Sequence, residues 1–205
     1  MKDLLVLVAD RNMEGVFKGL LSRHRALGIR EISYDIIRHP EKDPGCRTKS
    51  VEFIRPLRTT YRHALIVFDR EGSGSRLASA MEDTNVIEVA ISHTDWRDQA
   101  KVIVIEPELE NWIWVQSPLF DTTFDWDSST SSIREYLMGQ GYMFGTNLKP
   151  TRPKEALDAI LLKVNSPRSS SKYQDLASRA SFRLCSDPAF IRLKNCLINW
   201  FGLQL

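Results

Sequence analysis

Two acidic side chains directly follow a run of residues typical of a buried strand. Residues 64–76 read ALIVFDREGSGSR, so Asp69 and Glu71 lie one residue apart at the end of the apolar run. A parallel strand buried on both faces has a continuous apolar sequence, and α/β sheets bind ligands beyond the carboxyl ends of their strands. Two carboxylates there repel each other unless a cation or a proton lies between them. The stretch therefore predicts a divalent-metal site, and its alternative is an ordinary strand-to-helix turn with solvated acids.

Acids also follow the first predicted strand. Residues Leu4–Ala9 (LLVLVA) are apolar throughout, Asp10 comes next, and Glu14 falls in the first turn of a helix predicted over 12–27. We expect both carboxylates to face one point above the sheet. The alternative is that they only complement the positive end of the helix dipole.

A third set of acids follows residues 101–105 (KVIVI), which are predicted to form the last strand. Pro107 favours the first turn of a helix, and Glu106 and Glu110 would then face the same way, one turn apart. Because the carboxyl ends of parallel strands meet at one edge of a sheet, we expect Asp10, Asp69 and Glu71 to converge with Glu106 or Glu110.

The elements that must position these acids alternate between strands and helices. Strands are predicted over 4–9, 31–37, 64–68, 86–91 and 101–105, with short helices over 50–61 and 76–83 and a charged loop over 38–47. After a polar stretch at 119–132 the pattern is helical only, over 133–138, 153–164, 173–182 and 187–201, with a linker over 165–171. This order predicts an α/β fold: a Rossmann-like core over 1–118 with a mostly parallel central sheet and helices on both faces, and a helical C-terminal extension over 119–205 packed on the core.

Composition and charge limit the class of protein. No apolar run reaches membrane-spanning length, and no signal peptide is expected at the start of the chain. The three cysteines are far apart, which predicts free thiols in a reducing cytoplasm. Residues 149–205 hold 10 basic and 4 acidic side chains although the net charge is only +2. An acidic core beside a basic region suits a metal site next to a surface for a polyanion, and ordinary variation among solvated helices is the alternative.

Two common catalytic motifs are absent from the sequence. It contains neither the nucleotide-binding pattern G-x-x-x-x-G-K-[ST] nor the G-x-S-x-G elbow of serine hydrolases. The glycine-containing turn after Asp69 is therefore not a nucleotide loop of that type.

Taken in order, the acidic motifs resemble those of the TOPRIM fold found in topoisomerases, primases and OLD-type nucleases. Proteins with that fold place a glutamate after the first strand and Asp-x-Asp after the third. The matching residues here are Val8-Ala9-Asp10 to Glu14, then Asp69-Arg70-Glu71, then Leu109-Glu110-Asn111-Trp112. The chain looks closest to small TOPRIM-like proteins of prokaryotic defence islands. The likeness covers most of the chain.

The resemblance implies metal-dependent phosphoryl transfer on nucleic acid, most simply phosphodiester hydrolysis, in an anti-phage system of the methylation-associated kind. Asp69 and Glu71, with Asp10 or Glu14, would hold one or two Mg²⁺ or Mn²⁺ ions. Glu110 would be a further ligand or a base that orients water. The arginines nearest in sequence to these acids would neutralise the scissile phosphate, and basic residues of the C-terminal region would follow the nucleic-acid backbone. The arginines are Arg11, Arg70 and Arg76, and the basic residues include Lys149, Arg152, Lys154, Arg168 and Lys172.

Three residues depart from the family pattern. Asp10 stands where the fold has glutamate, Glu71 replaces the second aspartate, and Arg11 replaces the glycine after the first acid. The substitutions move the oxygens by about one bond length, and Mg²⁺ demands near-ideal geometry. A binding or scaffold subunit of a multi-protein defence complex, with the fold kept and the chemistry lost, is therefore the second hypothesis. A flavodoxin-like small-ligand domain is the third, and it leaves the acids unexplained.

Overall fold

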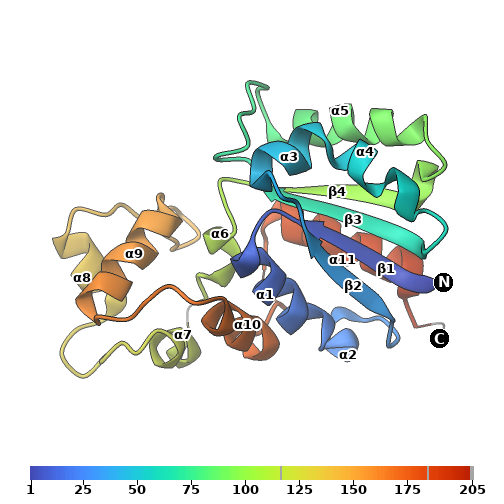
Figure 1. The fold of residues 1–205 in the computed structure, drawn as a ribbon. Coiled ribbons are helices and arrows are strands. Elements are labelled where there is room, and N and C mark those ends of the chain that lie inside the picture. Colours follow the sequence, from blue (N-terminus) through green and yellow to red (C-terminus); the bar gives the residue numbers. More distant parts are fainter. Residues whose placement is uncertain (116, 184, 204–205) are drawn as a thin grey trace.

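A parallel sheet of four strands, in the order β2–β1–β3–β4, forms the centre of the computed structural model (Figure 1). The structure describes residues 1–115, 117–183 and 185–203. The strands are β1 (Lys2–Val8), β2 (Tyr34–Arg38), β3 (Tyr61–Asp69) and β4 (Ala100–Ile105). The apolar runs of β1, β3 and β4 are buried almost completely, as expected for parallel strands covered on both faces. The predicted α/β fold with a parallel sheet is thus confirmed.

Helices cover both faces of this sheet (Figure 1). One face carries α1 (Arg11–Leu21), α2 (His24–Leu27) and α11 (Pro188–Phe201), and the other carries α3 (Lys42–Thr48), α4 (Ser50–Ile54) and α5 (Ala80–Ser92). Two 3₁₀ turns, η1 (Arg55–Leu57) and η2 (Arg97–Gln99), precede β3 and β4. Because α1 and α5 leave β1 and β3 toward opposite faces, the chain reverses its winding between these two strands. Such a switch point is where open α/β sheets bind ligands.

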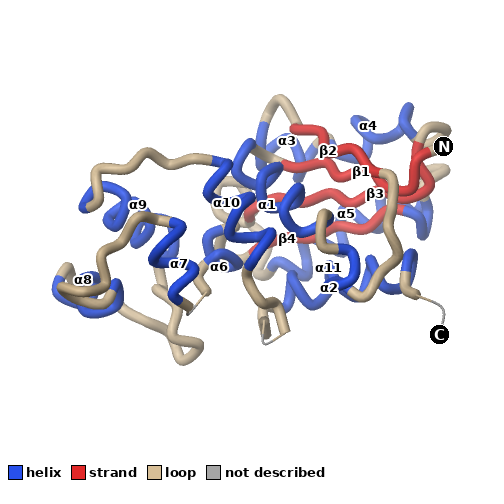
Figure 2. The backbone as a smooth tube through the Cα atoms, turned by 90° about the horizontal axis from the view of Figure 1, so that it is seen from below, coloured by secondary structure: helices blue, strands red, loops and turns tan. Residues whose placement is uncertain are grey.

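The chain after β4 is helical and in part returns to the core. It forms α6 (Glu110–Ile113), α7 (Pro118–Thr123), α8 (Ile133–Gly139), α9 (Pro153–Lys163), α10 (Ser170–Arg179) and then α11. Helices α8 and α9 stand apart from the sheet in both views, whereas α10 lies along α1 (Figures 1 and 2). The α1–α10 contact is close because of two glycines: a Cβ atom at Gly15 would lie 2.4 Å from the Ser170 carbonyl oxygen, and one at Gly19 2.4 Å from that of Gln174.

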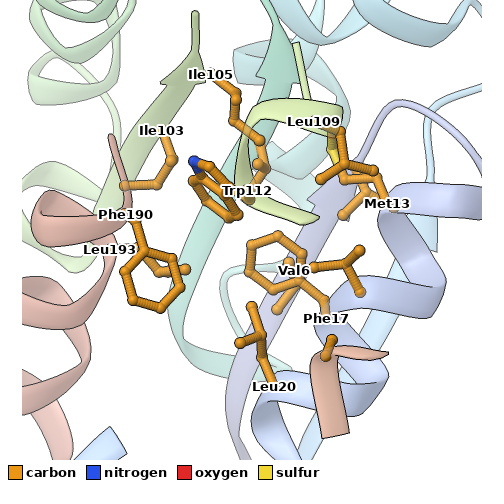
Figure 3. Packing of buried hydrophobic residues seen from close by; sticks show 14 of the residues in the cluster. Val6, Met13, Phe17, Leu20, Ile103, Ile105, Leu109, Trp112, Phe190 and Leu193 are labelled. Atoms are coloured by element: carbon orange, nitrogen blue, oxygen red, sulfur yellow. The ribbon is translucent and has the colours of Figure 1, made fainter. Parts of the chain in front are cut away.

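Trp112 of α6 packs against α1 and α11, two of the helices on one face of the sheet. Its ring packs at 5.3 Å, edge to face, on Phe190 of α11 and at 6.3 Å on Phe17 of α1 (Figure 3). Its indole N–H donates to Asp187 Oδ1 at 2.9 Å, so the buried polar atom is satisfied. Trp112 and Trp114 are 6% and 8% exposed, which identifies both as core residues.

The strand predicted over Val86–Ile91 is wrong, because these residues lie in α5 and the sheet has four strands where the sequence predicted five. Ser79 caps this helix and accepts the Glu82 N–H at 3.2 Å. Ile87 and Ile91, four residues apart, are buried, whereas Val86 and Val89 are each 60% exposed. The burial period is therefore helical although four of the six residues are β-branched.

Three shorter predictions also differ from the structure. The helix predicted over 76–83 begins only at Ala80, and the loop predicted over 38–47 contains most of α3. Pro44 falls within the first turn of α3, where its missing N–H costs no hydrogen bond. The helix expected to begin at Pro107 begins at Glu110. No helix among the described residues is long and apolar enough to cross a membrane.

Candidate carboxylate site

Asp10 lies where β1 ends and α1 begins. It is the N-cap of α1, with extended backbone (φ −145°), and its Oδ1 accepts the Met13 N–H at 2.9 Å. Val8 pairs with Val67 in the parallel ladder, so Asp10 is level with Asp69, two residues further along β3. The two carboxylates that the sequence predicted to meet therefore stand at the switch point, one just after β1 and the other at the end of the neighbouring β3.

Asp69 ends β3 and is tied to an acid that the sequence did not single out. The backbone N–H of Asp69 donates to Asp43 Oδ1 at 2.8 Å, so the loop that begins α3 lies across the end of β3. Asp69 Oδ1 is out of contact with solvent and has no hydrogen-bond partner among the described residues. A buried unpaired carboxylate oxygen is costly, so this atom is expected to have a proton or a cation beside it.

Burial and like charge act together on this cluster. Burial raises the pKa of Asp69 well above its ordinary value, and the carboxylates of Asp43, Glu110, Asp10 and Glu108 raise it further. The pKa of Asp43 is raised by burial and by Asp10. We define the carboxylate cluster as Asp10, Asp43, Asp69, Glu108 and Glu110. Within this cluster the neighbouring carboxylates oppose the ionisation of Asp69.

Two members of the carboxylate cluster have cationic partners from the C-terminal helical part. Glu108 lies 3.4 Å from the Lys154 ammonium and accepts the Lys154 backbone N–H at 2.9 Å. Glu110 is ion-paired with Arg168 and accepts the Tyr173 hydroxyl at 2.6 Å. Lys154 and Arg168, predicted to follow a nucleic-acid backbone, thus contact acids of the core.

The other three members have no ion-pair partner among the residues that the structure describes: Asp10, Asp43 and Asp69. Asp10 and Asp43 each accept a backbone N–H through Oδ1, and no described side chain occupies their second oxygen. The uncompensated negative charge of the site is therefore concentrated around Asp69.

The remaining acids predicted for the site lie outside this group. Glu14 points to Lys18 at 2.6 Å and Arg38 at 3.2 Å. Glu71 is exposed, although it lies close enough to raise the pKa of Glu108. The expectation that Glu106 and Glu110 face the same way is wrong, because the Glu106 side chain is 51% exposed and that of Glu110 only 4%.

The three arginines predicted to meet a phosphate have different surroundings. Arg11 and Arg76 are exposed. Arg70 is held by Glu106 at 2.8 Å and by the Leu77 carbonyl at 2.5 Å, and it lies 3.6 Å from the buried Asp83. Arg70 is thus engaged in fixing the loop after β3.

The donor set fits a hard divalent cation in its chemistry, since every candidate ligand is a carboxylate oxygen. Binding of such an ion would give the buried Asp69 Oδ1 the partner that it lacks among the described residues. Among the described residues, however, no group of three or more His, Cys, Asp or Glu side chains is already arranged to hold a metal. A cation would therefore have to draw the side chains of Asp10, Asp43 and Asp69 together.

Sequence reasoning missed Asp43 and Glu108. Asp43 was hidden in a charged loop whose path over the sheet no local pattern specifies. Glu108 alternates with Glu106 and Glu110 in the sequence, and the assumption of a helix from Pro107 directed attention to the outer two. Because α6 begins only at Glu110, the chain between Pro107 and Glu110 is not helical, and the side chains of Glu108 and Glu110 are both buried.

The chain was compared with protein-family models, with curated proteins and with solved structures, and none of the three comparisons found a match.

Proposed function

We propose that the chain is a Mg²⁺- or Mn²⁺-dependent phosphoryl-transfer protein, most simply a nuclease of the TOPRIM-like kind, with nucleic acid as its substrate. The observation that carries the proposal is the buried, unpaired Asp69 Oδ1 among carboxylates at the switch point of a parallel sheet. Asp69, Asp43 and Asp10 would hold the cation. A bound divalent ion supplies charge neutralisation at a transferring phosphoryl group and lowers the pKa of bound water.

Glu108 is the residue of the cluster best suited to move a proton. Burial and then Glu110 raise its pKa to about 7, and Lys154 opposes the rise. Proton transfer is most efficient when the pKa of the group lies near the working pH. Glu108 would thus accept a proton from attacking water, while Lys154 beside it stabilises the ionised form.

The first test measures Mn²⁺ binding to the wild-type chain and to Asp69→Asn. Thermal melting and calorimetric titration are the two readouts. One site at a hundredfold excess over Kd stabilises a protein by about 2.7 kcal/mol. We expect this stabilisation in wild type, its loss in Asp69→Asn, and its retention in Asp98→Asn, which removes an exposed acid from η2 before β4. Retention of Mn²⁺ binding by Asp69→Asn would remove Asp69 from the site.

The second test is cleavage of labelled single- and double-stranded DNA and RNA with Mn²⁺ present. Asp69→Asn is expected to abolish cleavage while the chain stays folded. The pattern of substrates cut identifies the nucleic acid.

A binding or scaffold subunit is the second candidate. It is favoured by the ion pairs of Arg168 with Glu110 and of Lys154 with Glu108, because these cations occupy carboxylates that a catalytic site would present to a metal. On this hypothesis Mn²⁺ produces no stabilisation of wild type, and Asp69→Asn raises stability by removing a buried charge.

A further inference from the structure

A hollow of about 710 Å³ lies beside the carboxylate cluster, at the carboxyl ends of β1 and β2. Its walls are the first turn of α1 and the segment that links β2 to α3. Arg11, Arg38 and Lys42 line it, together with His39 and with Asp10, which also acts on the pKa of Asp69. The hollow is thus continuous with the proposed cation site through Asp10.

The residues at the start of α1 line this hollow, and two of them have unpaired backbone donors. Asp10 takes the N–H of Met13 through its side chain and that of Glu14 through its carbonyl. The N–H groups of Arg11 and Asn12 have no partner among the described residues, and both residues line the hollow. Unpaired N–H groups and the positive end of an 11-residue helix attract an anion.

His39 is an independent sign of a ligand, because it is a buried polar side chain on the wall of the hollow. It is 4% exposed and packs at 5.0 Å on the ring of Phe53. Its Nδ1 accepts the Glu41 N–H at 3.1 Å, so the neutral imidazole carries its hydrogen on Nε2. Burial lowers the pKa of His39 and favours this neutral form. Nε2 has no hydrogen-bond partner among the described residues and is accessible to solvent, so this donor is open to a ligand.

Among the described residues, the wall side chains without an ion-pair partner are two cations, Arg11 and Lys42, and one carboxylate, that of Asp10. Glu14 is compensated by Lys18 and Arg38, at 2.6 and 3.2 Å. Arg11 and Lys42 are exposed, and neither forms an ion pair with any described residue. The two cations therefore outnumber the one unpaired carboxylate of the hollow, which His39 and the N-terminus of α1 also line.

We propose that this hollow binds a phosphate group of the nucleic-acid strand, with Arg11, Lys42, the unpaired N–H groups of α1 and His39 Nε2–H as its donors. The inference rests on the proposed function, since that function makes a nucleic acid the ligand. It adds a positioning subsite beside the carboxylate cluster. The phosphate is either a terminal phosphomonoester or an internal phosphodiester, and both present oxygens to the same donors.

The test is fluorescence anisotropy of a short labelled single-stranded oligonucleotide in EDTA, with and without a 5′-phosphate, at constant ionic strength. Inorganic phosphate serves as the competitor, with chloride as its control. The variants are Arg11→Gln, His39→Leu and His39→Gln, in which the glutamine keeps an N–H donor near the position of Nε2. Arg62→Gln removes an exposed arginine near the amino end of β3, at the opposite edge of the sheet, and is the matched control.

We expect inorganic phosphate to compete and both Arg11→Gln and His39→Leu to weaken binding about tenfold, the loss of one charge-assisted hydrogen bond. His39→Gln should recover part of this loss, and Arg62→Gln should change affinity less than about twofold. A preference for the 5′-phosphate identifies a terminal group, whereas equal affinities identify a phosphodiester. If His39→Leu does not fold, the exposed Arg11 still decides the outcome.

Failure of competition by phosphate, or an equal loss in Arg62→Gln and Arg11→Gln, would overturn the inference. The proposed function fails by a different measurement, which is the absence of Mn²⁺ binding at Asp69. Binding of the oligonucleotide in EDTA with no Mn²⁺ binding would leave the phosphate subsite standing and reject the metal-dependent chemistry.

Discussion

Replacement of Glu108 by glutamine is expected to stabilise the folded chain at pH 8 and to leave its stability almost unchanged at pH 4. Glu108 is 3% exposed. Burial and then the Glu110 carboxylate raise its pKa from 4.5 to about 7, although Lys154 opposes the change. Ionised Glu108 is therefore a destabilising group in the native state.

The sign and size follow from proton linkage. Between pH 4.5 and about 7 the native state keeps a proton that the unfolded chain has released, so the stability of the fold falls as the pH rises through this window. At about 1.4 kcal/mol for each pH unit between the two pKa values, the full penalty is about 3 kcal/mol. Glutamine carries no charge to bury, and its Oε1 still accepts the Lys154 N–H that Glu108 accepts at 2.9 Å. The free energy of unfolding should thus rise by up to about 3 kcal/mol at pH 8.

The assay is thermal melting in EDTA at pH 4, 6 and 8. For a chain of this size a gain of about 3 kcal/mol corresponds to a rise in Tm of roughly 6–12 °C. The control is Glu106→Gln, which removes the same charge from a side chain that is 51% exposed, and it should give no such pH dependence. A Glu108→Gln variant that is less stable by the same amount at every pH would refute the reasoning, because Glu108 would then be a stabilising partner of Lys154.

Three further variants test the surroundings of the site by melting and, for the last, by phosphate binding. Arg168→Met leaves the buried Glu110 without its cation and should cost about 3–5 kcal/mol, and the double variant with Glu110→Gln should recover much of the loss. Gly19→Ala should cost about 1–3 kcal/mol by forcing α1 from α10, with exposed Gly139→Ala as its neutral control. Gly45→Ala places a Cβ 2.1 Å from His39 Nδ1, so it should displace the imidazole and weaken phosphate binding; unchanged affinity would remove His39 from the subsite.

The strands of the sheet were predictable because burial on both faces leaves a direct mark in the sequence. The apolar runs of β1, β3 and β4 are interrupted at once by the polar residues that follow, and parallel pairing then puts Asp10 beside Asp69. Residues 86–91 carry the same kinds of side chain, yet the Ser79 cap and the burial of Ile87 and Ile91 make them helical. The composition of six residues does not distinguish a strand from a helix. The spacing of the buried residues does, and that spacing depends on how the segment packs in the fold.

The acids of the site were only partly predictable, for a related reason. Asp10 and Asp69 are fixed by strand ends, whereas Asp43 arrives through the β2–α3 connection and Glu108 through the chain before α6. Such connections are placed by tertiary contacts, here the Asp69 N–H bond to Asp43. The sequence predicts that Arg168 lies in a linker and contacts nucleic acid. It gives no sign that the buried Glu110 lies within reach of Arg168.

The two halves of the carboxylate cluster differ in charge balance, and this difference argues for a cation at one place. Glu108 and Glu110 form ion pairs with Lys154 and Arg168 from the C-terminal helical part. Asp10, Asp43 and Asp69 have no such partner among the described residues, and the unpaired oxygen lies on Asp69. Burial and the neighbouring carboxylates raise the pKa of Asp69 and favour its protonated form, but one proton there leaves the other two carboxylates without a counter-charge. A divalent ion neutralises two carboxylates and gives Asp69 Oδ1 the partner that it lacks. The aspartates, rather than the glutamates, are therefore where Mn²⁺ is expected to bind first.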